Sequence, residues 1–168
     1  MEDSFRAPLQ TFMYFRRRDD YMKSHLIDLE RKALQLRNAG RLKEAAELFA
    51  AIVKDQPDWE HGTAFYNLAC CYEDLAELAL AEHCFSKALD YDPKSPIFLG
   101  GHAAFLYIHG DPSKAFSSYL NLLERHKVNN DQKGIESAMI ALKTLGKQMG
   151  ISDEAVAERI EKPSIRRS

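Results

Sequence analysis

Cysteine and histidine side chains are the groups in this sequence with the widest chemistry, and four of them fall close together. Cys70 and Cys71 are adjacent, and His83 and Cys84 follow a short distance later. Small zinc sites use a C-x2-C spacing, which is missing here, and adjacent helical residues point about 100° apart. We therefore expect no metal site, and Cys71 and Cys84 are explained more simply as small core residues.

No catalytic motif accompanies these thiols. The sequence contains no nucleophile elbow, phosphate-binding loop or H-E-x-x-H pattern. The acidic pair Glu73-Asp74 is expected on a helix, as solvated charge or at the rim of a groove. Other histidines are scattered along the chain, at His61, His102, His109 and His126. The expectation is a protein that is not an enzyme and needs no cofactor.

The composition is that of one folded domain. A chain of 168 residues buries about 70% of the surface that its unfolded form exposes. A net charge of −2 gives no general attraction to nucleic acid or to a membrane surface. Three cysteines make no disulfide framework, no apolar run is long enough to span a bilayer, and the N-terminus lacks a signal-peptide pattern. We expect a soluble, cytoplasmic protein without nucleic-acid or membrane partners.

A recurring pattern predicts the helices that position these groups. Its central copy consists of Phe65, Leu68, Ala69 and Tyr72, followed by Ala81, Phe85, Ala88 and Pro93. The same slots hold, upstream, Leu29, Ala33, Leu36, Gly40, Ala45, Phe49, Ile52 and Pro57, and downstream Leu99, Ala103, Leu106, Gly110, Ala115, Tyr119 and Leu122. Small residues at Ala69 and Ala81 let two helices approach closely, and Pro93 ends the second one. The pattern resembles the tetratricopeptide repeat.

The resemblance implies an all-α fold, a right-handed solenoid of antiparallel helix pairs with extra helices at both ends. The predicted plan is a helical extension over 1–25, repeats over 26–59, 62–95 and 96–126, capping helices over 131–162, and a flexible tail over 163–168. Two residues, Lys32 and His102, depart from the family pattern because each stands where leucine is usual. The link around Trp59 holds two extra residues.

The corners between paired helices carry their own signals. Gly40 suits a helix end because it adopts positive φ without a Cβ clash. Ala76 stands at the matching corner of the next repeat, which predicts a more regular and tighter turn there. Asp111 and Pro112 are typical of an N-cap and of the first residue of a helix.

The N-terminal helix, predicted from Pro8 to about His25, carries more large apolar residues than a capping helix needs to hide. One interpretation is packing against the first repeat. A second is a plug for the protein's own groove, and a basic membrane contact is the least favoured because Asp19 and Asp20 offset the neighbouring arginines. The remaining one is a self-association face that forms a homodimer, built from Leu9, Phe12, Met13 and Phe15.

The first helix of each pair should line a concave groove. The predicted peptide-binding residues are Ile27, Glu30, Leu34, Tyr66, Asn67, Cys70, Ile97, Gly101, Ala104 and Tyr107. Solvent alone would favour polar residues here, so the apolar members indicate an occupant, either a partner segment or one of the chain's own terminal helices. Gly100-Gly101 inside a helix costs about 1 kcal/mol per glycine relative to alanine, which predicts the close approach of another backbone.

Two functions of proteins with this repeat can be compared with the predicted groove residues. Some tetratricopeptide co-chaperones grip acidic chaperone tails with lysine, arginine and asparagine side chains. Here the matching places hold Glu30, Leu34, Asn67, Ile97 and Gly101, and only Asn67 fits, so a carboxylate would find no cation. Class II chaperones of type III secretion are similar in layout, with an N-terminal self-association helix, three repeats and a closing helix.

The predicted function is a protein–protein adaptor or chaperone that holds an extended segment of a partner in the groove. Within the same class, the alternative is a secretion-type chaperone or an immunity protein that masks a toxin. The alternative from a different class is a structural subunit, assembled through its N-terminal helix or its convex face. Repeat folds serve many functions, so the fold alone does not choose among them.

Overall fold

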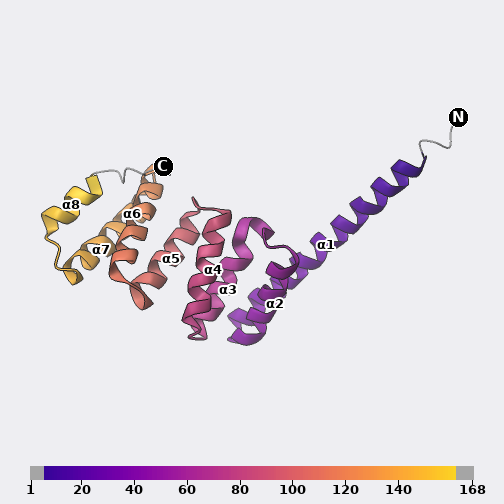
Figure 1. The fold of residues 1–168 in the computed structure, drawn as a ribbon, viewed down its shortest axis with the longest axis horizontal. Helices are drawn as coiled ribbons and strands as arrows, with labels where there is room; N and C mark the ends of the chain where they lie inside the picture. The colour runs from indigo at the N-terminus through magenta and orange to yellow at the C-terminus, as the bar shows by residue number, and fades with distance from the viewer. Residues whose placement is uncertain (1–5, 162–168) are drawn as a thin grey trace.

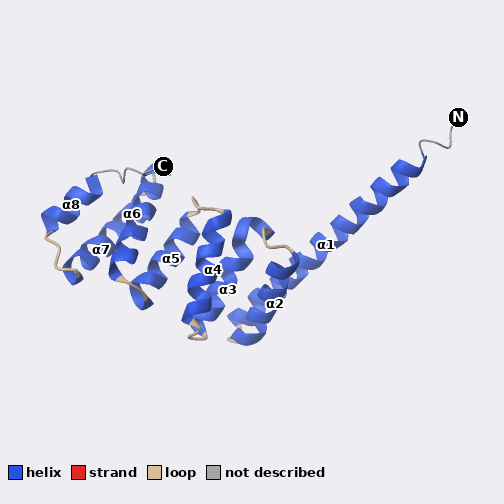
Figure 2. Ribbon diagram, in the orientation of Figure 1, coloured by secondary structure: helices blue, strands red, loops and turns tan. Residues whose placement is uncertain are grey.

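The computed structural model describes the backbone of residues 6–161 and side chains from Tyr21 onward. Helices make up all the regular structure of this range, and no strand occurs in it (Figure 2), which confirms the all-α prediction. In chain order the elements are α1 (Arg6–Asn38), α2 (Leu42–Asp55), the short 3-10 helix η1 (Trp59–Gly62), α3 (Thr63–Asp74), α4 (Leu78–Tyr91), α5 (Pro96–His109), α6 (Pro112–Val128), α7 (Gln132–Gln148) and α8 (Asp153–Glu161).

The helices stack in chain order into an elongated solenoid (Figure 1). Each helix packs against the one before it and the one after it, and α8 packs on α7 at the far end. The predicted solenoid of helix pairs is confirmed. At the C-terminal end, Gly146 of α7 leaves room for Val156, since a Cβ there would lie 2.4 Å from Val156 Cγ2.

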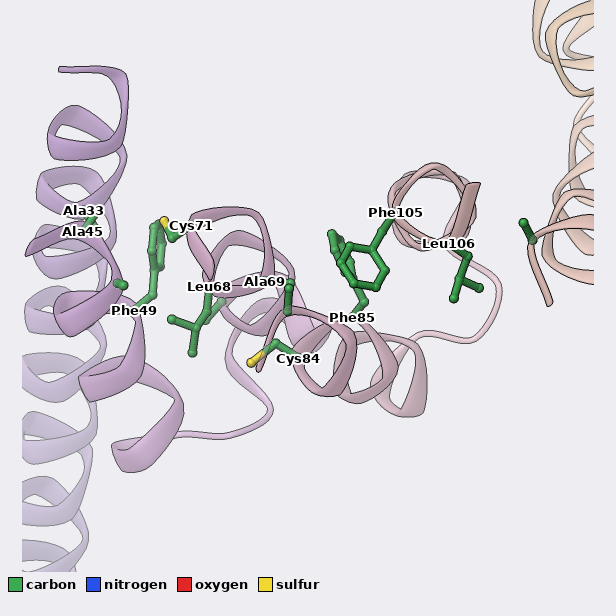
Figure 3. Close-up of a cluster of buried hydrophobic side chains, with 14 of the residues drawn as sticks. Ala33, Ala45, Phe49, Leu68, Ala69, Cys71, Cys84, Phe85, Phe105 and Leu106 are labelled. Atoms are coloured by element: carbon green, nitrogen blue, oxygen red, sulfur yellow. The ribbon is translucent and has the colours of Figure 1, made fainter. Parts of the chain in front are cut away.

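Small buried residues bring the paired helices together, as the pattern predicts. Ala33 and Ala45 are fully buried between α1 and α2, and Ala69 and Ala81 are fully buried between α3 and α4. Aromatic residues then join one pair to the next, with the ring of Phe85 5.4 Å from that of Phe105 on α5 (Figure 3). The core is therefore a continuous row of side chains along the stack.

The first helix differs from the prediction in its extent. The helix expected to end near His25 continues without a break to Asn38, so α1 is 33 residues long. Its partner α2 has 14 residues, and the N-terminal part of α1 extends beyond the stack (Figure 1). The side chains of Leu9, Phe12, Met13 and Phe15, predicted to form a self-association face, lie outside the described side chains.

Several helix ends share one left-handed corner. Gly40, Ala76, Asn130 and Gly150 all have positive φ, and in each case the following N–H donates to the carbonyl five residues earlier, as Glu77 does to Tyr72. The regular, tighter corner predicted at Ala76 is wrong, because this alanine adopts the same conformation as Gly40, with φ of 61°. The predicted cap of α6 is confirmed, since Asp111 Oδ1 accepts hydrogen bonds from Ser113 N and Lys114 N.

Candidate peptide-binding groove

One stripe of α5 presents apolar side chains to solvent. Ile97, Gly101, Ala104 and Ile108 fall at the spacing of one helical face, and Ile97 and Ile108 are 66% and 64% exposed. The whole helix, PIFLGGHAAFLYIH, contains no aspartate, glutamate, lysine or arginine. The middle of the stripe holds only the small residues Gly101 and Ala104.

Gly101 makes room for a side chain of the protein itself. A Cβ at this position would lie 2.5 Å from Cε2 of Tyr66 on α3, whereas one at Gly100 would meet only Leu122 Cδ2 at 3.9 Å. The close approach predicted from Gly100-Gly101 is therefore made at Gly101 by the Tyr66 ring and not by a foreign backbone. Nothing in the structure explains the glycine at position 100.

We call the ring of Tyr66, which lies between α3 and α5, the ridge. Its ring stacks on Phe98 with centroids 5.2 Å apart and meets Phe85 edge-on at 5.8 Å. Burial raises the pKa of its hydroxyl and of the Cys70 thiol one helical turn away. Tyr66 is thus held in place by its neighbours, and an occupant of the groove would contact the ridge without moving it.

Asn67 and Cys70 lie deeper than the sequence indicated. Asn67 is 8% exposed, which leaves little of its amide within reach of a partner. Burial raises the pKa of Cys70, and it raises the pKa of Cys71 and Cys84 to about 11. These thiols stay protonated near neutral pH, so they behave as small apolar groups and not as nucleophiles.

The α1 side of the groove divides its predicted residues between two roles. Ile27 and Leu34 are exposed, as a contact surface requires. Glu30 instead accepts a hydrogen bond at 3.2 Å from Nε1 of Trp59, which is buried between α1 and the stack. The two extra residues of the link shape this anchor, because Glu60 and His61 both adopt left-handed backbone angles beside it.

Ion pairs cross the groove near the C-terminal ends of its helices. Arg37 Nε of α1 lies 4.0 Å from Asp74 Oδ2 of α3, and Glu73 Oε1 of α3 lies 3.3 Å from His109 Nε2 of α5. The sequence pattern indicated rim charge at Glu73-Asp74 but not the partners of these groups. The available signal was a basic residue near the end of each flanking helix. The partly exposed pair of Arg37 and Asp74 contributes about 0–1 kcal/mol, and the contact of Glu73 with His109 is an ion pair only when the histidine is protonated. The main effect of both contacts is to make this end of the groove polar.

Neither end of the described chain fills the groove. The N-terminal part of α1 points away from the stack, and α8 lies against α7 (Figure 1). Ile27, Ile97 and Ile108 remain exposed. Within residues 6–161, the structure therefore gives no support to the interpretation that a terminal helix plugs the groove.

Two kinds of site are missing from the described part of the chain. No group of three or more histidine, cysteine, aspartate or glutamate side chains in it is arranged to hold a metal ion. None of its helices combines the length and apolar character that crossing a membrane requires.

Known proteins show the same architecture. The sequence model of the tetratricopeptide repeat family matches residues 62–95, which contain α3 and α4. The structure of the type III secretion chaperone SycD from Yersinia enterocolitica, in complex with a peptide of the translocator YopD, matches with a TM-score of 0.65, 22% identity, and coverage of 75% of this chain and 95% of that one. The first such domain of Spaghetti, bound to an HSP90 peptide, matches with a TM-score of 0.63, 17% identity, and coverage of 74% and 93%.

The stacked helix pairs and these matches define a helical-repeat protein. More narrowly, residues 62–95 match the tetratricopeptide repeat, and the stack as a whole has a fold like that of SycD. By sequence, the chain is 29% identical over 123 residues to a chloroplastic protein of Arabidopsis thaliana. The match covers 68% of this chain but 32% of that protein, so the chain spans about a third of its relative's length.

Proposed function

We propose that the protein binds an uncharged, extended apolar segment of a partner protein, as an adaptor or chaperone. The supporting observation is that the most exposed groove residues, Ile97 and Ile108, lie on a helix without a single formal charge. Burying two such side chains contributes about 1.5–3 kcal/mol each relative to leaving them in water. The segment lies over α5 beside the Tyr66 ridge, while the ion-paired end of the groove stays solvated.

The proposal agrees with the peptides bound by two proteins of the same fold, and it differs in the chemistry of the ligand. The Spaghetti domain holds an HSP90 peptide of sequence SRMEEVD, which is rich in acidic residues at its end. Here Ile97 and Gly101 stand where the co-chaperone clamp has cations, so a carboxylate tail has no charged partner. The expected segment is apolar, as a groove of this composition requires.

A peptide selection from a displayed random library, on the full chain, tests this proposal. The selected segments should be apolar, and calorimetry should show that replacing both Ile97 and Ile108 by serine lowers their affinity at least tenfold, or about 1.4 kcal/mol. Ile140→Ser is the matched control, because Ile140 is 67% exposed but lies on α7 among polar residues. Selection of charged segments, or equal losses in all variants, would contradict the proposal.

The length of α1 supports a second function, assembly through the part of this helix that α2 does not cover. An isolated helix of fewer than roughly 15 residues is marginal in water, so a projecting one gains stability from a partner, such as a second copy of the chain. Light scattering of the full chain and of a variant lacking residues 1–20 tests this idea. The truncated form is expected to contain fewer copies per particle than the full chain, with unchanged peptide affinity. The same number of copies in both forms would refute the idea.

A further inference from the structure

The chain contains a segment with the chemistry expected of a groove ligand. Residues 7–15, APLQTFMYF, include no charged residue, and most of them are apolar or aromatic. The groove helix α5 likewise contains no aspartate, glutamate, lysine or arginine. Association of two such surfaces is favoured because it removes apolar area from water. The segment therefore matches the uncharged, apolar ligand proposed above.

This segment does not reach the groove of its own molecule. It belongs to α1, which is one unbroken helix from Arg6 to Asn38, and the N-terminal part of α1 points away from the stack (Figure 1). Folding back onto α5 would require a break in α1, which would leave backbone groups at the break without their helical partners. The groove that a projecting helix can enter is that of a second copy of the chain.

The segment also has the spacing of a helix that binds in a groove. Leu9, Phe12, Met13 and Arg16 follow the order i, i+3, i+4 and i+7, so these four positions share one face of α1. The first three are apolar and the last is basic. This face is therefore an apolar strip that is followed, toward the stack, by a positive charge.

The groove has a complementary order of apolar and charged groups. The exposed stripe from Ile97 to Ile108 is about 17 Å long, and residues 7–16 of a helix span about 14 Å. Directly after Ile108, the polar end of the groove begins, where two carboxylates, those of Glu73 and Asp74, face one arginine and one histidine. While the histidine is neutral, this end has one negative charge in excess. An apolar helix face followed by an arginine fits this arrangement.

We propose that, without a partner protein, residues 7–16 of one copy occupy the groove of a second copy, and that the exchange is reciprocal. The apolar face lies on the α5 stripe beside the Tyr66 ridge, and Arg16 pairs with Glu73 of the other copy. Reciprocal exchange closes as a two-fold dimer. A partner's segment displaces the helix, so the groove is covered until a ligand competes for it. This inference rests on the groove and the projecting helix of the proposed function.

Sedimentation equilibrium of the full chain tests the exchange by charge reversal. Arg16→Glu and Glu73→Arg should each raise the dissociation constant of the dimer at least fivefold. The double variant should restore the dimer, because both contacts regain a pair of opposite charges. Arg18→Glu is the matched control and should leave the dimer unchanged, since position 18 lies about 180° around α1 from position 9.

A second set of measurements tests the place of the contact. Replacing both Ile97 and Ile108 by serine should dissociate the dimer, whereas Ile140→Ser should not. An apolar peptide selected on the full chain should dissociate the dimer as it saturates the groove. The chain lacking residues 1–20 should keep one peptide affinity at every protein concentration, and the full chain should match it only when diluted to the monomer.

Three results would overturn the inference. They are a monomeric full chain, a double charge variant that dimerises no better than the single variants, and a dimer that persists when peptide saturates the groove. A dimer that the two serine substitutions leave intact, in a variant that no longer binds the peptide, would also overturn it. That last outcome would leave the proposed peptide binding in place, so the two proposals fail separately.

Discussion

The first two helix pairs and the third share an architecture but present different chemistry to the groove. On α1 and α3, charged groups are engaged with one another, as in the pair between Arg37 and Asp74, or with the link, as Glu30 is with Trp59. On α5 the groove face is apolar and most exposed at Ile97 and Ile108. A repeat scaffold fixes where side chains point, and each repeat sets its own binding character.

The turns between paired helices also differ between the first two pairs and the third. The first two pairs turn through the left-handed residues Gly40 and Ala76. The third turns through Gly110 in an extended conformation, and α6 then begins at the Asp111 cap. The third pair is thus built with a different turn as well as a different surface, so the two regions can be perturbed separately.

The largest effect is expected from Trp59, which joins the link between the first two helix pairs to Glu30 of α1. Trp59→Ala should lower the free energy of unfolding by about 3–5 kcal/mol, as for other large buried aromatic residues. Trp59→Phe, which keeps most of the ring but removes the donor to Glu30, should cost about 1 kcal/mol from the lost hydrogen bond. Urea denaturation measures both. Because α5 is untouched, the two variants should keep their peptide affinity at temperatures where they are folded. Loss of peptide affinity in both variants would contradict the separation between the first two helix pairs and the third.

The next effect concerns the two glycines of α5. Gly101→Ala should lower the free energy of unfolding by about 1–3 kcal/mol, because the new methyl group displaces the Tyr66 ring. Gly100→Ala is the matched control and should raise it by about 0.5–1 kcal/mol, since alanine is the better helix former. In a Tyr66→Ala background the clash disappears, so Gly101→Ala should become stabilising there too. Equal effects at the two glycines in the wild-type background would show that the ridge has no energetic role.

A smaller, opposite effect is expected at the second corner. Ala76→Gly should raise the free energy of unfolding by about 0.5–1 kcal/mol, because glycine adopts the left-handed conformation without a Cβ penalty. Ala79→Gly, on the exposed face of α4, is a control that should lower it by a similar amount. Thermal unfolding of the two variants distinguishes the cases; destabilisation by both would contradict the left-handed corner.

The smallest effect expected is a pH dependence of the free energy of unfolding that comes from His102 in the third helix pair. Burial lowers the pKa of His102 below its ordinary value of 6.5, with Glu82 acting against and Lys114 adding to the shift. The unfolded chain then binds more protons than the folded one as pH falls through 6.5, so His102 makes the protein less stable toward acid. The slope of stability between about pH 7 and 5.5 should be shallower in His102→Leu than in wild type, measured by urea denaturation. Parallel slopes would contradict a buried, neutral histidine.

Much of the fold was accessible from residue types and spacing. The small residues Ala33, Ala69 and Ala103 recur at intervals that allow only close helix packing, and all three are fully buried. The candidate site was less accessible. Ile97 was expected to be open to solvent and is exposed, but Glu30 and Asn67 were assigned to binding on position alone. Their hydrogen bonding and burial depend on Trp59 and on neighbouring helices, which the local pattern does not specify.

The sequence by itself determined a stack of helix pairs, because short-range periodicity and small residues act within and between adjacent helices. It also determined which helix is apolar, since α5 carries no formal charge wherever it is placed. Only the tertiary structure decided that Tyr66 occupies the space above Gly101, that Arg37 meets Asp74, and that the His102 ring lies against Phe85. Each of these depends on the rotation and separation of helices from different repeats, and a difference of a few ångströms there changes which side chains touch.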